Sequence, residues 1–372
     1  AAVRRAPLTA RCAVRVALRR AAACAGLQGG ALVHVYTDGT VLVSHGGTEM
    51  GQGLHTKVCQ IVAHALDVPL SDVHIAETAS DKVANSMPTA ASMSNDLYAM
   101  AALDACEQIL KRLAPVRKSL PPGAPLKAVA AKANFERVDL SAHGFFAVDD
   151  ARCGYDWALE PPPRKPDGTP DNARRGLPFN YFTQGVAIAE VELDVLTGDH
   201  AVLRADLLVD VGSTINAPLD VGQIEGAFAQ GVGLCTIEEV VWADDEHSWV
   251  QPRGRLLTRG PGAYKLPSFN DVPRDLRVGL MQRVANPFAV HSSKAVGEPP
   301  LFLGFSVFMA LRDAVRAARV EHLGASAHAH FTLHSPATSE RLRMACADRF
   351  ARMAVELNGR GDVGSYVPKG SF

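Results

Sequence analysis

The sequence lacks the features that mark several common protein classes. Its 372 residues include only 7 scattered cysteines and no Cys-x-x-Cys pair, which argues against a zinc ribbon, an iron–sulfur site or a disulfide scaffold. No run of about 18 uncharged apolar residues occurs, so no membrane-spanning helix is predicted. The 38 basic and 39 acidic side chains nearly cancel, which excludes strong sequence-independent attraction to nucleic acid or to an anionic membrane.

Familiar catalytic motifs are also missing. A P-loop requires Lys after Gly51, where Gln52 stands, and the third glycine of a dinucleotide fingerprint is absent. No Gly-x-Ser-x-Gly elbow occurs. The 13 histidines form no His-x-x-x-His pair in a segment with helical patterning. Function must therefore be sought in other combinations of residues.

The hydrophobic patterning is of mixed type. Period-two alternation predicts one hairpin within 32–44 and another within 186–211, each around a glycine-containing turn. Helical spacing predicts helices from Leu54, from about Asn95, after Asn216 and from near Pro300. A strand, a glycine-rich loop and a helix follow one another twice without a fixed period, which indicates an α+β or α/β class.

We divide the chain into five segments. Residues 1–28 are rich in Arg and Ala and lack acids, as in a transit peptide. Because a transit peptide is removed from a mature chain, we favour a start that lies upstream of the folded part. Residues 29–113 and 179–357 carry the candidate motifs. Prolines predict a loop-rich insert over 114–178, and 358–372 form a tail.

A glycine-rich stretch, residues 46–53, precedes the helix expected from Leu54. Glycines allow the backbone to approach a ligand closely, and free N–H groups at a helix start favour an oxyanion. Gln52 adds an amide that both donates and accepts hydrogen bonds. The alternative is a plain tight turn into a helix, which these residues alone favour.

A second loop, residues 85–94, consists mostly of small and hydroxyl-bearing residues. Small side chains leave room for a bulky flat ligand, and an over-long helix cap explains the loop equally well. The hydroxyls available to a ligand are those of Thr89, Ser92 and Ser94. Gln223 and Gln230 lie seven apart on one helix face; if buried, they need a heterocycle or backbone groups as partners.

Glu298 is the sharpest single candidate for a catalytic group. It lies between an apolar segment and an apolar helix start, where a carboxylate is costly unless it is paired or protonated. Loss of water would strengthen it as a proton acceptor, and the following helix N-terminus would offset part of that effect. The alternative is a carboxylate that only caps backbone N–H groups. Neighbouring glycine and prolines favour a fixed geometry.

Four motifs are together far more specific than any one of them. They are GGTEMGQGLHTK (46–57), PTAAS (88–92), GQIEGAFAQG (222–231) and SKAVGEPPLFLG (293–304). Their order and approximate spacing resemble the C-terminal part of the molybdenum domain of the xanthine dehydrogenase and xanthine oxidase family, from residue 29 to 357. The resemblance implies part of an α+β molybdenum-cofactor-binding domain, with mixed sheets and packed helices.

The resemblance also implies a reaction and its residues. A molybdenum–molybdopterin cofactor, with no direct protein ligand to the metal, would hydroxylate hypoxanthine and xanthine to urate in purine catabolism. The Mo–OH oxygen would attack the purine, hydride would pass to Mo=S, and Glu298 would act as general base. Ala91 would lie adjacent to molybdenum. The implied cofactor-binding residues are Gly51, Gln52, Gly53, Thr89, Ala90, Ala91, Ser92, Ser94 and Gln223.

Partners follow from the same resemblance. The complete enzyme would add FAD and two [2Fe-2S] clusters on domains outside this chain, form a homodimer and lie in the cytoplasm, with the peroxisome as the alternative. NAD or oxygen as final acceptor stays open. Residues 1–30 contain no match to the purine-reading residues of the family. Two other hypotheses therefore remain: a partial, non-catalytic pterin-binding or interaction module, and an aldehyde-oxidase-type hydroxylase, against which the 88–92 run argues.

Overall fold

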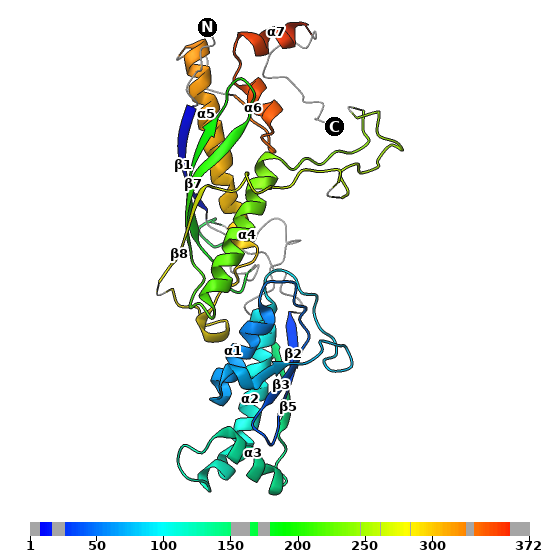
Figure 1. Cartoon of the computed structure of the whole chain (residues 1–372), viewed down its shortest axis with the longest axis vertical. Coiled ribbons are helices and arrows are strands. Elements are labelled where there is room, and N and C mark those ends of the chain that lie inside the picture. Colours follow the sequence, from blue (N-terminus) through cyan, green and yellow to red (C-terminus); the bar gives the residue numbers. More distant parts are fainter. Residues whose placement is uncertain are drawn as a thin grey trace.

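The computed structural model consists of two lobes, stacked along the long axis of the molecule (Figure 1). Each lobe contains a four-stranded sheet with helices packed against it. The backbone alone is described for 8–16 and for Leu357. The described residues are 8–16, 27–149, 164–169, 179–245, 247–260, 262–282, 284–324 and 331–357.

The lower lobe is built from residues 27–149, and its strand order is β4-β3-β2-β5. Its strands are β2 (Gln28–Val35), β3 (Val41–His45), β4 (Val73–Ile75) and β5 (Ser141–Ala147). The hairpin predicted around Asp38 is confirmed, with Val33 opposite Val43. The helices are α1 (Leu54–Leu66), η1 (Leu70–Asp72), α2 (Ser94–Lys118) and α3 (Leu126–Phe135).

The upper lobe has the strand order β1-β6-β7-β8. Its strands are β1 (Leu8–Val16), β6 (Gly185–Leu193), β7 (His200–Val209) and β8 (Asp275–Leu280). Its helices are α4 (Ala217–Thr236), η4 (Val290–Ser292), η5 (Pro299–Gly304), α5 (Phe305–Leu323), α6 (Ser339–Ala345) and α7 (Arg349–Leu357). Helix α5 packs on β1 and β6, and α4 packs on η5. Both sheets are mixed, because β3–β4 and β7–β8 are parallel pairs.

Two expectations about the segments are wrong. Residues 1–28 do not all precede the fold, because β1 pairs antiparallel with β6 along its whole length. The segment 114–178 is not uniformly loop-rich, because it contains α3 and β5. The prolines misled the prediction: Pro125 is the N-cap of α3, and Pro115 lies within α2. Backbone N–H groups are dispensable at a helix start, so proline there begins a helix and does not exclude one.

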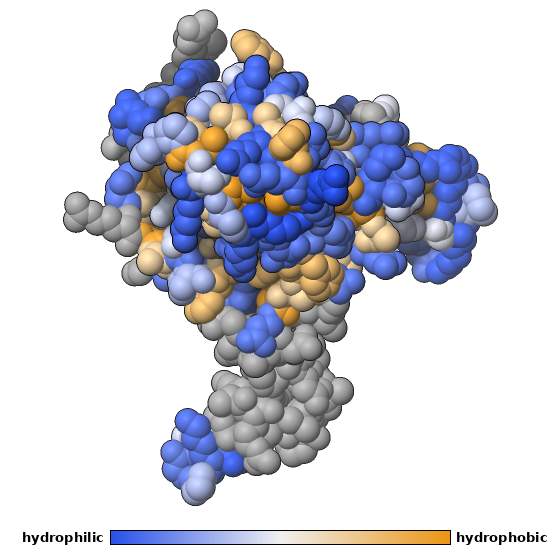
Figure 2. All heavy atoms as spheres, turned by 90° about the horizontal axis from the view of Figure 1, so that it is seen from below, coloured by the Kyte–Doolittle hydropathy of each residue, from blue (hydrophilic) through white to orange (hydrophobic). Residues whose placement is uncertain are grey.

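Each lobe has its own hydrophobic core. Helix α2 packs on β2 and β5, and α1 buries Leu54, Val58 and Leu66 in the same core, mainly against α2. Helix α5 buries Val307 and Leu311 against the upper sheet. Within the described part of the chain, no helix is both long and apolar enough to cross a membrane. On the face that Figure 2 presents, hydrophobic residues lie in small groups among hydrophilic ones.

Candidate functional site

A cavity of about 380 Å³ lies where the two lobes meet. The lower lobe contributes the loop before α1, the loop before α2 and the first turns of both helices, while the upper lobe contributes α4 and residues 293–298. The predicted site residues that line it are Gln52, Thr89, Ala90, Ala91, Ser92, Ser94, Gln223 and Glu298. Gly51 and Gly53 flank Gln52 in the same loop. The structure therefore brings the four distant motifs together.

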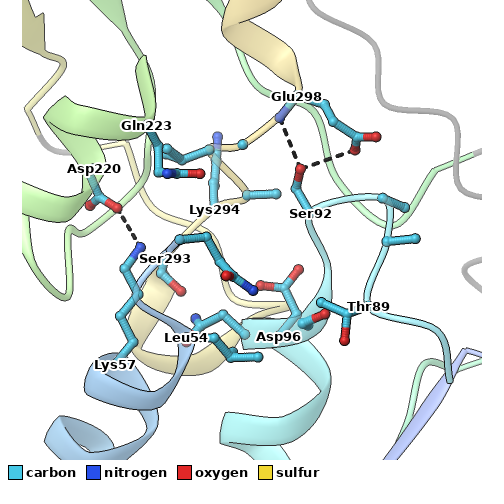
Figure 3. Close-up of a pocket in the computed structure, with 18 of the residues that line it drawn as sticks. Leu54, Lys57, Thr89, Ser92, Asp96, Asp220, Gln223, Ser293, Lys294 and Glu298 are labelled. Atoms are coloured by element: carbon cyan, nitrogen blue, oxygen red, sulfur yellow. Dashed lines mark hydrogen bonds and ion pairs between the residues drawn. The ribbon is translucent and has the colours of Figure 1, made fainter. Parts of the chain in front are cut away.

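Glu298 lies at the mouth of this cavity, beside Ser92 (Figure 3). The Ser92 hydroxyl donates to Glu298 Oε2 at 3.0 Å, and Ser92 Oγ accepts the Glu298 N–H at 2.9 Å. Glu298 is exposed. The expectation that its carboxylate is removed from water is therefore wrong within the part of the chain that the structure describes. The reason is geometric: Pro299 and Pro300 are buried at the start of η5, whereas Glu298 is the residue before them and reaches across the rim.

The backbone beneath Glu298 is strained and tightly packed. Ala91 and Ser92 have φ values of 55° and 51°, a left-handed conformation that costs energy in residues other than glycine and clusters at functional sites. Gly297 lies directly against this turn, since a Cβ there would come within 2.7 Å of Ser92 Oγ. Only glycine allows the two loops to approach this closely.

The glycine-rich loop binds a carboxylate of its own. Glu49 Oε1 accepts the N–H groups of Gly51 (2.8 Å) and Gly53 (3.0 Å), and Oε2 accepts that of His55 (3.0 Å). Burial opposes ionisation, but these three donors outweigh it and hold the pKa of the Glu49 carboxyl below its ordinary value. Glu49 thus occupies three of the N–H groups that an oxyanion could use, as expected for a plain tight turn into α1.

Gln52 and Thr89 also help to hold this loop. Gln52 Oε1 accepts the Met50 N–H at 2.6 Å, and Gln52 Nε2 donates to the Thr48 carbonyl at 2.9 Å. Thr89 Oγ1 accepts the Thr48 N–H at 2.8 Å. Both ends of the Gln52 amide are thus engaged within the loop, while the hydroxyl proton of Thr89 remains available to donate.

Two adjacent histidines, the buried His45 and the partly buried His55, support the same loop. His45 is fully buried at the end of β3, and its Nδ1 accepts the Gly47 N–H at 3.0 Å. A neutral ring must then carry its proton on Nε2, which lies 3.0 Å from His55 Nδ1. Burial, and then repulsion from His55, lower the pKa of His45 from 6.5 to about 4. His45 is therefore neutral in the folded protein at neutral pH.

Two ion pairs that the sequence did not predict lie beside the cavity. Lys57 of α1 forms an ion pair with Asp220 of α4 that links the two lobes, with 2.6 Å between Lys57 Nζ and Asp220 Oδ1. The Thr214 hydroxyl also donates to Asp220. Lys294 and Asp210 are 2.5 Å apart, with side chains 7% and 3% exposed. Lys57 and Lys294 belong to the recognised motifs, but their partners are distant in sequence and no spacing rule identifies them.

The cavity also presents a polar atom in need of a ligand. Asn95 Oδ1 is buried in its wall and has no hydrogen-bond partner among the described residues. Such an atom is costly unless it is satisfied by a donor. Gln223 and Gln230 add amides from α4, and Ala90 and Ala91 leave space. A volume in the ~300–1,000 Å³ range of ligand pockets and this mixture of donors and acceptors suit a pterin.

The chain belongs to the molybdopterin cofactor-binding domain family, which it matches over residues 6–273. It is 51% identical over 325 residues to a xanthine dehydrogenase of Oryza sativa subsp. japonica, and this similarity covers 87% of this chain and 22% of that protein. A xanthine dehydrogenase/oxidase of Rattus norvegicus is 49% identical, with coverages of 88% and 23%. The chain thus spans less than a quarter of these relatives. The resemblance found in the motifs is confirmed.

Solved structures share the fold. A reconstituted CO dehydrogenase from Oligotropha carboxidovorans has a TM-score of 0.69 and 18% identity, over 95% of this chain and 41% of that one. A quinoline 2-oxidoreductase from Pseudomonas putida 86 has a TM-score of 0.70 and 21% identity, over 92% and 42%. The expected α+β fold of a molybdenum-cofactor-binding domain, with mixed sheets and packed helices, is confirmed.

Proposed function

We propose that this chain is the C-terminal part of the molybdenum domain of an oxidoreductase that hydroxylates hypoxanthine and xanthine. One observation carries the proposal: four motifs distant in sequence converge on a single cavity, with the carboxylate of Glu298 at its mouth. The similarity to xanthine dehydrogenases over most of the chain supports the substrate class.

The cavity would hold molybdopterin through polar groups from both lobes. Thr89, Ser94 and Asn95 line the cavity from the lower lobe and Gln223 lines it from the upper lobe. The Gln52 amide would contribute once its hydrogen bonds within the loop are released. Gly51 and Gly53 would shape that loop, and Ala91 would leave room beside the metal. When bound, the molybdenum centre supplies the oxygen that enters the substrate and accepts the two electrons.

Within this arrangement Glu298 would remove the proton that accompanies oxygen transfer. Ser92 fixes the carboxylate by donating to Oε2, so that Oε1 is left to accept the proton. A general base works best with restricted access to water. Because Glu298 is exposed here, we assign its cover to parts of the complete enzyme beyond this chain.

The test is Glu298→Gln in a complete, cofactor-loaded enzyme. Turnover of xanthine should fall by at least ~10²-fold, the usual contribution of a general base, while molybdenum content stays at the parental level. Glu225→Gln, at an exposed position on α4, is the matched control and should keep full activity. Turnover of the Glu298 variant within about tenfold of the parent would refute the role.

We also propose how the electrons leave the molybdenum centre and how the complete enzyme assembles. FAD and two [2Fe-2S] clusters on other domains would carry the electrons away, and NAD or oxygen would receive them. A homodimer in the cytoplasm is the assembly that we propose. An aldehyde-oxidase-type enzyme would instead prefer N-heterocyclic aldehydes to xanthine, which a comparison of kcat/KM decides.

A second candidate is a partial module that binds pterin without catalysis. The exposure of Glu298 favours it for the chain taken alone. Titration of the purified 372-residue chain with molybdopterin, followed by an assay with xanthine and an artificial electron acceptor, separates the two. Binding without turnover supports the module, and turnover excludes it.

A further inference from the structure

We propose that Tyr181 is a positioning residue that fixes the segment carrying Glu298, through a buried bridge to Asp96. The inference rests on the proposed function for its catalytic consequence, but the bridge itself is geometric. Tyr181 lies just before β6 in the upper lobe and Asp96 lies in the first turn of α2 in the lower lobe; they are 8% and 3% exposed.

The tyrosine hydroxyl makes contacts on both sides. It donates to Asp96 Oδ2 at 2.5 Å and accepts the backbone N–H of Ala295 at 3.0 Å. Because the amide can only donate, the phenolic proton must point to Asp96, whose Oδ2 accepts it. A charged acceptor strengthens such a bond and polarises the phenol, so its oxygen becomes a better acceptor for Ala295.

The short segment from Ala295 to Glu298 is consequently held at both ends. Asp96 fixes the first end through Tyr181, and Ser92 fixes the second by bonding both the N–H and the carboxylate of Glu298. Ser92 and Asp96 belong to one stretch of the lower lobe, at the start of α2. The segment that carries the carboxylate is thus tied at two points, to the first turn of α2 and to the turn that precedes it.

Lys294, the residue before Ala295, is held by contacts of its own. Lys294 donates to the carbonyl of Phe182, which lies before β6, and to Asp210, which follows β7, so the residue next to Tyr181 is joined to the segment that leads to Glu298. Loss of the Tyr181 hydroxyl would leave this pairing in place, while it removes the acceptor of the Ala295 N–H and a donor to Asp96. The expected effect is therefore local.

The first measurement is amide hydrogen exchange on the full 372-residue chain, which requires no activity. Tyr181→Phe should speed exchange of the Ala295 amide about tenfold, because it loses its buried acceptor, while peptides of β2 and β3 keep parental rates. Tyr36→Phe, at a half-exposed tyrosine, is the matched control. Unchanged exchange at Ala295 would overturn the proposal.

If Tyr181→Phe speeds amide exchange throughout the chain, the variant has destabilised the whole fold, and Asp96→Asn is then the variant that tests the bridge. Its amide oxygen still accepts from Tyr181 but lacks the charge, so exchange should rise at Ala295 by a smaller factor and nowhere else. Parental exchange in Asp96→Asn would then overturn the proposal.

The second measurement is steady-state kinetics of the complete enzyme. Tyr181→Phe should lower kcat for xanthine about tenfold or more through misplacement of Glu298, with KM and molybdenum content unchanged. A rise in KM at constant kcat would refute the positioning role. The Glu298→Gln enzyme tests the proposed function separately. If that enzyme is fully active while Tyr181→Phe speeds exchange at Ala295, the contact between Tyr181 and Ala295 is supported and the catalytic role of Glu298 is refuted.

Discussion

The two loops that face each other across the cavity are held in different ways. The glycine-rich loop, residues 46–53, satisfies its hydrogen bonds almost entirely from within, through Glu49, Gln52 and the adjacent His45. The segment 293–298 depends on residues far away in the sequence, with Ser92 and Glu298 separated by 206 positions.

The conformation of the first loop is thus determined mainly by local contacts, and that of the second by tertiary contacts. The shape of the first loop should depend mainly on its own side chains, with one further contact from Thr89, whereas the second loop should respond to changes in either lobe. Variants that remove one long-range partner therefore test the second loop, and variants within 45–53 test the first. We expect the long-range contacts to have the larger effects.

The largest effect is expected from Lys294→Met, which removes one member of a buried ion pair. Asp210, only 3% exposed, would lose its cation, and breaking such a pair typically costs about 3–5 kcal/mol. Urea unfolding measures the loss. Lys82→Met, which breaks the exposed pair with Asp81, is the control and should cost less than about 1 kcal/mol. Equal effects of the two variants would contradict the distinction.

The next effect is a pH dependence set by His45. Its folded pKa of about 4 lies below the ordinary 6.5, so between these values the unfolded chain binds the extra proton. Stability is therefore full above pH 6.5 and falls by about 3 kcal/mol as pH decreases to 4. His45→Gln does not titrate in this window and should flatten the profile. Parallel profiles for parent and variant would exclude His45 as the cause.

The sequence predicted the local features of the molecule well. The turn at Asp38 and the N-cap at Asn216, whose side chain accepts the Leu219 N–H, follow from residue types within a few positions. The motifs also predicted which segments surround the cavity. These are properties that short-range stereochemistry and a family resemblance encode.

Tertiary partners could not be predicted in this way. Nothing near Lys57 or Tyr181 in the sequence indicates Asp220 or Asp96 as its partner, because the packing of one lobe on the other determines both pairs. The exposure of Glu298 was missed for the same reason. Its neighbours are apolar in sequence, but they turn inward at the start of η5 while Glu298 does not.

A smaller effect is expected where the glycine-rich loop meets α4. Gly53 has a φ of 78°, and a Cβ there would collide with the side chain of Leu219. Gly53→Ala should therefore destabilise the protein by about 2 kcal/mol, from left-handed strain and displacement of that leucine. Gly222→Ala, in α4 with open space around it, should instead stabilise by about 0.5–1 kcal/mol. Thermal unfolding compares them, and a neutral Gly53→Ala would argue against close α1–α4 contact.

The smallest effect is expected from Glu49→Gln, which keeps the size of the side chain but removes its charge and one of its two acceptor oxygens at the start of α1. Loss of a charged cap should cost about 1 kcal/mol at pH 7. Because the folded pKa of Glu49 lies below its ordinary 4.5, its contribution is complete above pH 4.5 and disappears as pH falls through the folded value. The difference in unfolding free energy between parent and variant should therefore close in acid. A difference that stays constant however far the pH is lowered would mean that Glu49 acts through the second acceptor oxygen that glutamine lacks and not through its charge.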